Sequence, residues 1–139
     1  MLEFKSKSKK TDINIPLKFV SNILKNRSIA FIISDFISQD YSNSLKIFSS
    51  RHDVTGIRVY DQTEEIIPNL GVIDINDNET GKRITVNTTS KNLRKKYNEY
   101  YNSKRNEFID FFKRSGSGII ECNTQDDYQK KLLKYFKSR

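Results

Sequence analysis

The fold is decided by Ile29-Ala-Phe-Ile-Ile-Ser-Asp-Phe36, an uninterrupted apolar run that ends on a serine and a carboxylate. Such a run is typical of a parallel strand that is buried on both faces of a sheet. A second run, Val54 to Tyr60, follows after a helical interval and ends on Asp61. Two strands arranged in this way predict a strand–helix–strand crossover in an α/β sheet with helices on both faces.

The carboxylates that follow these two strands mark the first place to look for function. In open α/β sheets the ligand crevice lies beyond the carboxyl ends of the strands, so Asp35 and Asp61 should lie at that edge. A hydrolase centred there would also need a nucleophile and a base, and the sequence offers no such pair.

Apolar periodicity predicts the elements around these strands. The predicted elements are a helix over 13–24, a strand over 28–34, a helix over 41–51, a strand over 54–60, a hairpin over 72–86, a long helix over 90–115, a strand over 118–122 and a last helix that carries Tyr128, Leu132, Leu133 and Phe136. Thr124 and Asp127 resemble a capping box for that last helix. The predicted fold class is therefore α/β, with three layers, a three-stranded parallel core, an inserted β-hairpin and four helices.

Composition narrows the class of protein. The chain has 139 residues, a length that suits a single domain, and its net charge is +8. A basic surface favours nucleic acid or an anionic membrane as a partner without deciding between them. The lone Cys122 excludes an internal disulfide and is compatible with a reducing compartment. No apolar run approaches a membrane span or the core of a signal peptide, so we expect a soluble, cytoplasmic protein.

Patterns for catalysis or soft-metal binding are weak. His52 and Cys122 are the only residues of their types, and two ligands cannot make a zinc site. A Cys–His nucleophilic pair is not expected, because His52 precedes the second strand whereas Cys122 ends the third. Asp74-Ile-Asn-Asp-Asn78 resembles the start of a calcium loop but lacks its glycine and final glutamate, which favours a hairpin turn. The sequence therefore favours a protein that is not an enzyme.

Basic residues on the long helix could form a strip for nucleic acid together with Tyr97, Tyr100 and Tyr101. We expect the tyrosines to fall on the core-facing stripe of this helix and the basic side chains on its opposite, solvated face. A solvated face is therefore the better interpretation. The basic residues are Lys91, Arg94, Lys95, Lys96, Lys104 and Arg105.

A series of short segments, in order along the chain, carries a resemblance to a known family. The segments are Thr11-Asp-Ile, Ser34-Asp-Phe, Arg51-His-Asp-Val, Arg58-Val-Tyr-Asp61, Ile67-Pro-Asn-Leu-Gly71, Asp77-Asn-Glu-Thr-Gly81, the helix with Arg94 and Tyr97, Thr124-Gln-Asp-Asp-Tyr128 and Phe136-Lys-Ser-Arg139. Together they resemble the C-terminal part of the bacterial family of domain of unknown function fifty-eight. That family is a von Willebrand factor A-like domain, usually encoded beside MoxR-type AAA+ ATPases. The resemblance implies that residues 1–139 form one partial, Rossmann-type domain that lacks the first strands.

The resemblance also implies an incomplete metal-ion-dependent adhesion site. In that site Asp35 corresponds to the last acidic position and Thr11 to the lone threonine. The string Asp40-Tyr-Ser-Asn-Ser44 matches the D-x-S-x-S of the site, but it does not directly follow a buried strand. Capping of the next helix by Asp40 is therefore the better interpretation. Two ligands predict at most a weak, hydrated Mg²⁺ site and no required cofactor.

The resemblance favours a non-enzymatic protein-interaction module that serves as an adaptor for a MoxR-like AAA+ ATPase in complex maturation or metal insertion. The alternative is a basic protein associated with nucleic acid. The strand over 29–33 would lack a neighbour on one side and would present unpaired backbone groups beside apolar side chains. We therefore expect the isolated chain to form a homodimer through this strand.

Overall fold

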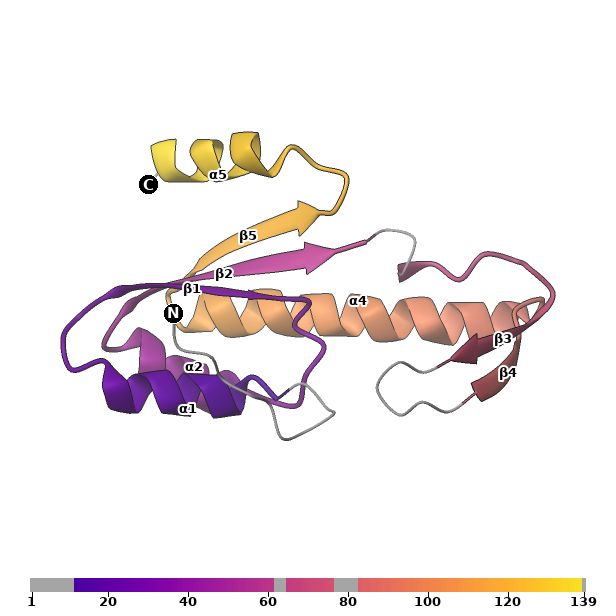
Figure 1. Ribbon diagram of the computed structural model, residues 1–139, viewed down its shortest axis with the longest axis horizontal. Coiled ribbons are helices and arrows are strands. Elements are labelled where there is room, and N and C mark those ends of the chain that lie inside the picture. Colours follow the sequence, from indigo (N-terminus) through magenta and orange to yellow (C-terminus); the bar gives the residue numbers. More distant parts are fainter. Residues whose placement is uncertain (1–11, 62–64, 77–82, 139) are drawn as a thin grey trace.

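A three-stranded parallel sheet forms the middle layer of the protein. The structure is a computed structural model that describes residues 12–61, 65–76 and 83–138. The strands are β1 (Ile29–Ser34), β2 (Asp53–Tyr60) and β5 (Gly118–Asn123), in the order β1-β2-β5 (Figure 1). The predicted α/β class and the parallel core are confirmed.

The strand register places β1 at one edge of this sheet. β1 pairs with β2 from Ile29 opposite Asp53, and β2 pairs with β5 from Thr55 opposite Gly118. All three strands run in the same direction, so the residues that follow them gather at one edge. Asp35 and Asp61 follow β1 and β2 directly, as predicted.

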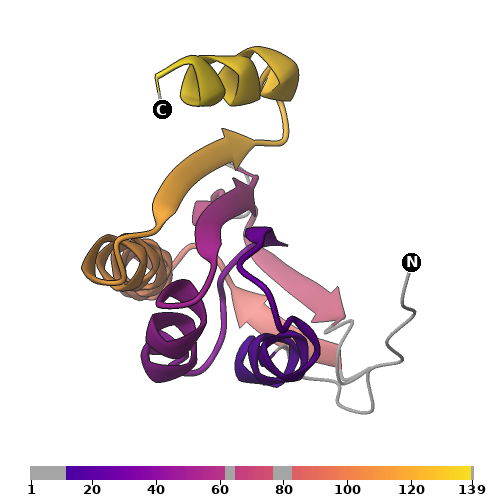
Figure 2. The same cartoon turned by 90° about the vertical axis from the view of Figure 1, so that its left-hand side faces the viewer.

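Helices cover both faces of the sheet (Figures 1 and 2). One face carries α1 (Asn14–Ile23), α2 (Ser42–Ser49) and α4 (Lys91–Arg114), and the other carries α5 (Tyr128–Lys137). The four predicted helices are therefore present, and the arrangement has three layers. None of the helices in the described parts of the chain has the length and apolar character needed to cross a membrane.

The larger core lies between the sheet and the first group of helices. Phe108 and Phe112 of α4 are fully buried against Gly56 in the middle of β2. A Cβ atom added to Gly56 would lie 2.4 Å from Cε1 of Phe112, so only glycine lets the ring approach the strand this closely. Leu45 of α2, next to α4, and Leu17 of α1, beyond α2, extend this core in one direction (Figure 2).

A smaller core lies beneath α5. Leu132 and Tyr135 pack against Ile57, Ile120 and Cys122, which belong to β2 and β5. The helix therefore covers the β2 and β5 side of this face.

The predicted hairpin is formed by β3 (Val72–Asn76) and β4 (Arg83–Asn87), which pair antiparallel. The turn at 77–82 lies outside the described residues. The hairpin lies beyond the carboxyl edge of the parallel sheet, and α4 extends past the sheet in the same direction (Figure 1). The base of the hairpin is held by the buried Thr88, whose hydroxyl donates to the carbonyl of Gly71 (2.7 Å) and accepts from the N–H of Leu70 (2.9 Å).

The predicted capping box of α5 is wrong. Asp127 is the N-cap itself, and its carboxylate accepts a hydrogen bond from the N–H of Lys130 at 3.1 Å. Thr124 instead donates its hydroxyl hydrogen to Asp61, at 3.0 Å. Threonine and aspartate are both common at the first position of a helix. The hydroxyl of Thr124 instead bonds Asp61, which lies near it only in the folded sheet.

The strand register can be tested with two neighbouring isoleucines. Ile32 packs against the larger core, whereas Ile33 points to the other face and is 66% exposed. We expect Ile32→Ala to lower the free energy of unfolding by about 2 kcal/mol or more, and Ile33→Ala by less than about 1 kcal/mol. Both variants replace isoleucine by alanine in the same strand. A difference between their unfolding free energies, measured by chemical denaturation, therefore reports the difference in burial of the two side chains. Equal losses would contradict the register.

Candidate functional site

The turn Ser34-Asp35-Phe36 stands at the carboxyl edge of the sheet in a fixed conformation. Asp35 Oδ1 accepts hydrogen bonds from the N–H of Ile37 (3.1 Å) and the hydroxyl of Ser34 (3.2 Å). Phe36 has φ 58°, in the left-handed region that non-glycine residues rarely adopt. Its buried ring stacks on Phe108 with 4.3 Å between centroids, and this packing holds the strained backbone in place. The Asp35 side chain itself remains exposed.

The second carboxylate at this edge ties two strands together. Asp61 Oδ2 accepts the hydroxyl hydrogen of Thr124, and the backbone N–H of Thr124 donates to the carbonyl of Tyr60 at 2.9 Å. The ends of β2 and β5 are therefore linked by a side-chain bond and a backbone bond. Asp61 has a structural role at the place where the sequence predicted a ligand crevice.

The predicted metal ligands are only partly placed. Asp35 lies where the sequence puts it, and Thr11 lies outside the described residues. Nowhere in 12–61, 65–76 and 83–138 do three histidine, cysteine, aspartate or glutamate side chains gather as metal ligands would. One carboxylate, already bonded within its own turn, does not fit tight binding of Mg²⁺, which gives up its waters reluctantly.

The D-x-S-x-S string leads into α2, but the prediction that Asp40 caps this helix is wrong, because Tyr41 is the N-cap and its side chain makes no capping bond. Asp40 Oδ1 accepts a hydrogen bond from the N–H of Ser42, the first residue of the helix, at 2.8 Å. The hydroxyl and the backbone N–H of Ser42 hold the pKa of Asp40 below its ordinary value. Ser44 donates its hydroxyl hydrogen to Asn14 Oδ1 at 2.6 Å and so joins α2 to α1.

The single histidine and the single cysteine are far apart, as predicted. His52 directly precedes β2, its Nδ1 accepts a hydrogen bond from the N–H of Ser28 (3.3 Å), and its ring lies on Phe48 of α2. Cys122 is buried near the end of β5, beneath α5 on the other face of the sheet. The two side chains cannot act as a nucleophilic pair.

A buried ion-pair network lies beside this edge, and the sequence analysis missed it. Arg58 of β2 is 3% exposed, and its guanidinium pairs with Glu65 and, at 3.4 Å, with Glu121 of β5. Glu121 also accepts two hydrogen bonds from Arg105 of α4, at 2.7 and 2.8 Å. The sequence contained a signal for this pair, because one apolar run contains an arginine and the other a glutamate. The strand register sets Arg58 directly opposite Glu121.

A comparison with known families places the chain. The profile of the family described as protein of unknown function DUF58 matches residues 1–107. The chain belongs to this family. It is also similar to a Mycobacterium avium protein described as "Uncharacterized protein MAV169", with 26% identity over 118 residues that cover 83% of this chain and 68% of that protein. No solved structure matches the chain. The resemblance that the sequence motifs carried is confirmed at the level of the family.

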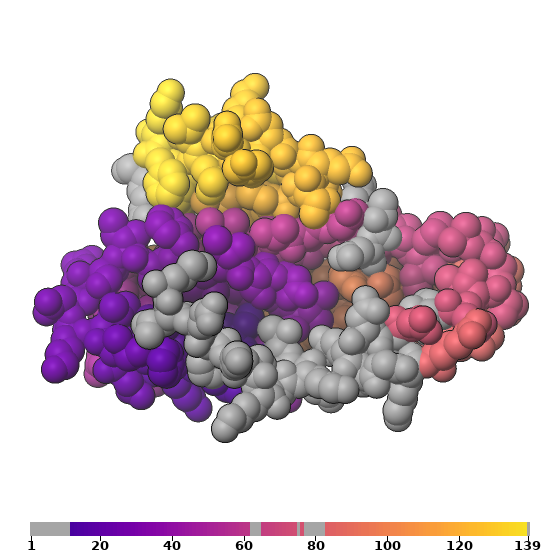
Figure 3. Space-filling model, in the orientation of Figure 1, coloured from indigo at the N-terminus to yellow at the C-terminus, as the bar shows by residue number. Residues whose placement is uncertain are grey.

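Within residues 12–61, 65–76 and 83–138 of the DUF58 chain, one face of β1 is exposed. Ile29, Phe31 and Ile33 alternate along the strand and point away from the larger core, with exposed fractions of 68%, 46% and 66%. Val59 of β2 is also exposed on this face. We call these four side chains the open sheet face. α5 forms a ridge (yellow in Figure 3) above the purple surface of the N-terminal part of the chain.

The basic strip predicted along the long helix of the DUF58 chain is partly paired with carboxylates. Of its six residues, Lys95 pairs with Glu99 (3.7 Å), Lys104 with Glu107 (2.8 Å) and Arg105 with Glu121 (2.7 Å). This pairing supports the solvated-face interpretation.

The expectation that all three tyrosines of α4 face the core is wrong. Phe108 and Phe112 are buried, but Tyr100 is exposed, and the hydroxyl of Tyr97 bonds that of Tyr101 at 3.1 Å. The reason is that this part of α4 runs past the sheet (Figure 1), where no core is available to cover it.

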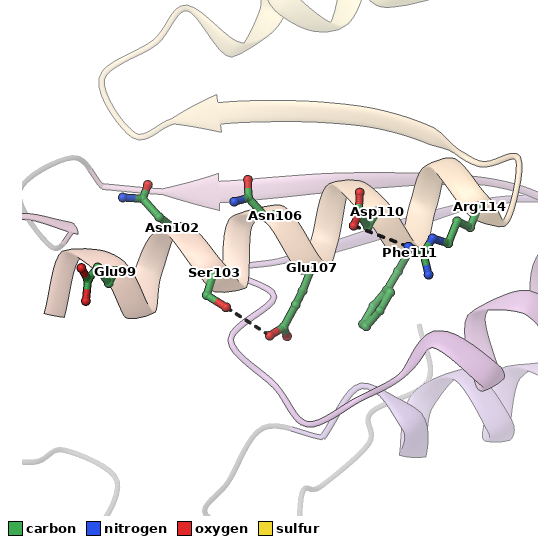
Figure 4. Close-up of a pocket in the computed structure, with 8 residues that line it drawn as sticks. All are labelled: Glu99, Asn102, Ser103, Asn106, Glu107, Asp110, Phe111 and Arg114. Atoms are coloured by element: carbon green, nitrogen blue, oxygen red, sulfur yellow. Dashed lines mark hydrogen bonds and ion pairs between the residues drawn. The ribbon is translucent and has the colours of Figure 1, made fainter. Parts of the chain in front are cut away.

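An open, shallow polar surface lies along α4. Its side chains project from successive turns (Figure 4), and several pair with one another, including Ser103 with Glu107 (3.5 Å) and Arg114 with Asp110 (3.9 Å). Glu107 is also held by Lys104 Nζ at 2.8 Å, so the contacts at this surface join neighbouring side chains of one helix. The lining residues are Glu99, Asn102, Ser103, Asn106, Glu107, Asp110, Phe111 and Arg114.

Magnesium should bind weakly at the Asp35 turn. Asp35 brings a single charge, and Thr11 would add only a hydroxyl. Calorimetric titration of the chain with Mg²⁺ should give a dissociation constant of about 1 mM or weaker, and Asp35→Ala should remove the remaining heat. Micromolar affinity would contradict this expectation and would require further ligands at the edge.

The Arg105–Glu121–Arg58 network should make stability sensitive to acid. Arg105, with help from Arg58, holds the pKa of Glu121 below its ordinary value of 4.5. Because the folded pKa is depressed, this stabilisation is present above pH 4.5 and is lost as the pH falls through the folded value. We expect Glu121→Gln to flatten the fall in unfolding free energy that the wild type shows as the pH drops below 4.5.

The matched control is Glu99→Gln on α4. Glu99 is exposed and contacts Lys95 only at 3.7 Å, so its removal should leave the pH dependence of the wild type unchanged. Identical curves for Glu121→Gln and Glu99→Gln would show that the buried network does not govern acid stability.

Proposed function

We propose that this DUF58 chain is a non-enzymatic protein-interaction module that serves as an adaptor for a MoxR-like AAA+ ATPase in complex maturation or metal insertion. The observation that carries the proposal is the open sheet face. Parallel sheets are ordinarily covered on both faces, so an apolar strand face left exposed is an interaction surface. The edge strand β1 presents this face across its whole length.

The carboxyl edge supports a binding role over a catalytic one. Asp61 links two strand ends through the hydroxyl of Thr124, and Asp35 is bonded to the hydroxyl of Ser34 and the N–H of Ile37, so both carboxylates are engaged in contacts that hold the local backbone. The choice of a MoxR-like ATPase as the partner rests on the resemblance to the von Willebrand A-like family, whose genes usually lie beside genes for such ATPases. We place this role in the cytoplasm, where the lone Cys122 stays reduced.

Capture of the ATPase tests the adaptor role. Tagged chain should retain the MoxR-type ATPase encoded beside it, and should not retain an unrelated AAA+ ATPase. Ile33→Lys, on the open sheet face, should lower retention at least about tenfold, because a charge in an apolar contact costs more than 1.4 kcal/mol. Ile47→Lys is the matched control, since Ile47 is 55% exposed on α2, beneath the other face.

Two results would count against the adaptor role. Failure of the wild-type chain to retain the ATPase would remove the proposed partner. Equal retention of the Ile33 and Ile47 variants would show that the open sheet face is not the surface involved.

The edge of β1 also supports the proposal that the isolated chain is a homodimer. β1 is the outermost strand of its sheet and contains no lysine or proline that would discourage pairing. Two copies joined antiparallel through β1 would satisfy the backbone groups of both edges about one two-fold axis. Light scattering should show twice the mass of the 16.3 kDa chain, and Phe31→Lys should return it to the monomer. A wild-type monomer at high concentration would defeat the dimer.

A further inference from the structure

α5 and β1 together present a continuous apolar surface. Phe136 of α5 meets Phe31 of β1 edge to face, with 5.8 Å between ring centroids. Leu133 precedes Phe136 by three residues and therefore lies on the same side of the helix, and both are exposed. We call the side chains of Ile29, Phe31, Ile33, Leu133 and Phe136 the β1–α5 apolar surface.

Positive charge borders this surface. Lys130 and Lys137 stand three residues before and four residues after Leu133, so they flank it along α5. In the part of the chain that the structure describes, neither lysine has a carboxylate within ion-pair distance, whereas Lys131, on another side of the helix, is paired with Asp126. Two lysines next to an exposed leucine complement a partner that carries both apolar and acidic side chains.

The arrangement of α5 shows what shape of partner fits. α5 covers β2 and β5 by setting Leu132 and Tyr135 on the sheet, and the strip over β1 beside it remains uncovered. A second helix beside α5 would complete the layer in the way that α/β sheets are ordinarily covered. β1 has six residues and is about 20 Å long, which corresponds to a helix of about 14 residues.

We propose that the β1–α5 apolar surface binds an amphipathic helix of a partner protein, with its apolar stripe on β1 and acidic side chains toward Lys130 and Lys137. The proposal rests on the proposed role as an interaction module and adds the chemistry of the partner segment. Apolar residues at positions i, i+3, i+4 and i+7 of that helix would meet Ile29, Phe31 and Ile33. Glutamate or aspartate beside this stripe would face the two lysines.

Two other occupants fit this surface less well. A second copy of the chain packed face to face would bring its own Lys130 and Lys137 against those of the first, and each copy carries a net charge of +8. A strand added to the edge of β1 would use backbone groups and would leave the side-chain face uncovered. The edge dimer and the helix site are therefore compatible.

A pair of synthetic peptides tests the proposal directly. Each has about 14 residues with leucines at i, i+3, i+4 and i+7, and the flanking charges are glutamates in one and lysines in the other. Each carries one tryptophan, whose fluorescence reports binding because the chain contains none. We expect the acidic peptide to bind at least about tenfold more tightly than the basic one, and the difference to shrink as salt is raised.

Variants of the chain locate the binding. Ile33→Thr should weaken the acidic peptide at least about fivefold, whereas Ile47→Thr on α2 should leave its affinity unchanged, since an exposed isoleucine is altered in both cases. The double variant Lys130→Glu/Lys137→Glu should reverse the preference so that the basic peptide binds more tightly. Lys113→Glu on α4, away from α5, is its control and should keep the wild-type preference.

Three results would overturn the proposal. The first is equal affinity for the two peptides, and the second is an equal effect of Ile33→Thr and Ile47→Thr on the affinity of the acidic peptide. The third is that neither peptide binds the wild-type chain, while light scattering shows a wild-type dimer that Ile33→Thr converts to a monomer. The last result would mean that a second copy covers the surface. If the peptide fails to bind while the ATPase is retained, this proposal fails and the adaptor role stands. If the acidic peptide binds while the ATPase is not retained, the helix site stands and the adaptor role fails.

Discussion

The contact between α4 and the middle of β2 is the constraint on which the rest of the structure depends. Gly56 has no side chain, so the rings of Phe108 and Phe112 lie directly against the strand. Phe36 stacks on Phe108, and this stacking fixes the turn that presents Asp35. On the other face Gly118 has the same role: a Cβ there would overlap the Tyr135 hydroxyl, which lies 3.2 Å from Thr55 Oγ1. Two glycines thus set how closely both helical layers approach the sheet.

Element order and strand direction could be predicted because they depend on local patterns. The apolar runs at Ile29–Ser34 and Asp53–Tyr60 predicted parallel strands, and the carboxylates that follow them had to meet at one edge. The expectation that the first strand is buried on both faces is wrong, because α5 packs over β2 and β5 and leaves Ile29 and Ile33 of β1 exposed. The capping of α5 could not be predicted in the same way. Several polar residues precede that helix, and the choice of Asp127 over Thr124 depends on Asp61, which is distant in sequence.

The errors at Arg58 and Tyr100 have opposite causes. The apolar run around Arg58 predicted a uniformly apolar strand, but a buried arginine requires a counter-charge, and the register supplies Glu121 from the third strand. Tyr100 keeps the helical period of the core stripe, but period alone does not say where the sheet ends. The candidate site could be predicted only in part. Asp35 could be placed because it directly follows a predicted strand. The other ligands of a metal site come from segments distant in sequence, and one of them, Thr11, lies outside the described residues.

The pairing of Arg58 with Glu121 also fixes the alignment of two strands that are far apart in the chain. A shift of β5 by one residue would set Arg58 opposite Ile120 or Cys122 and leave its buried guanidinium with Glu65 as its remaining counter-charge. An apolar mispairing at the same position would cost much less, so the charged pair discriminates between alignments more sharply than the isoleucines around it. In the sequence, β5 is separated from β2 by the hairpin and α4. Glu121 within β5 is the residue that favours the observed register with β2.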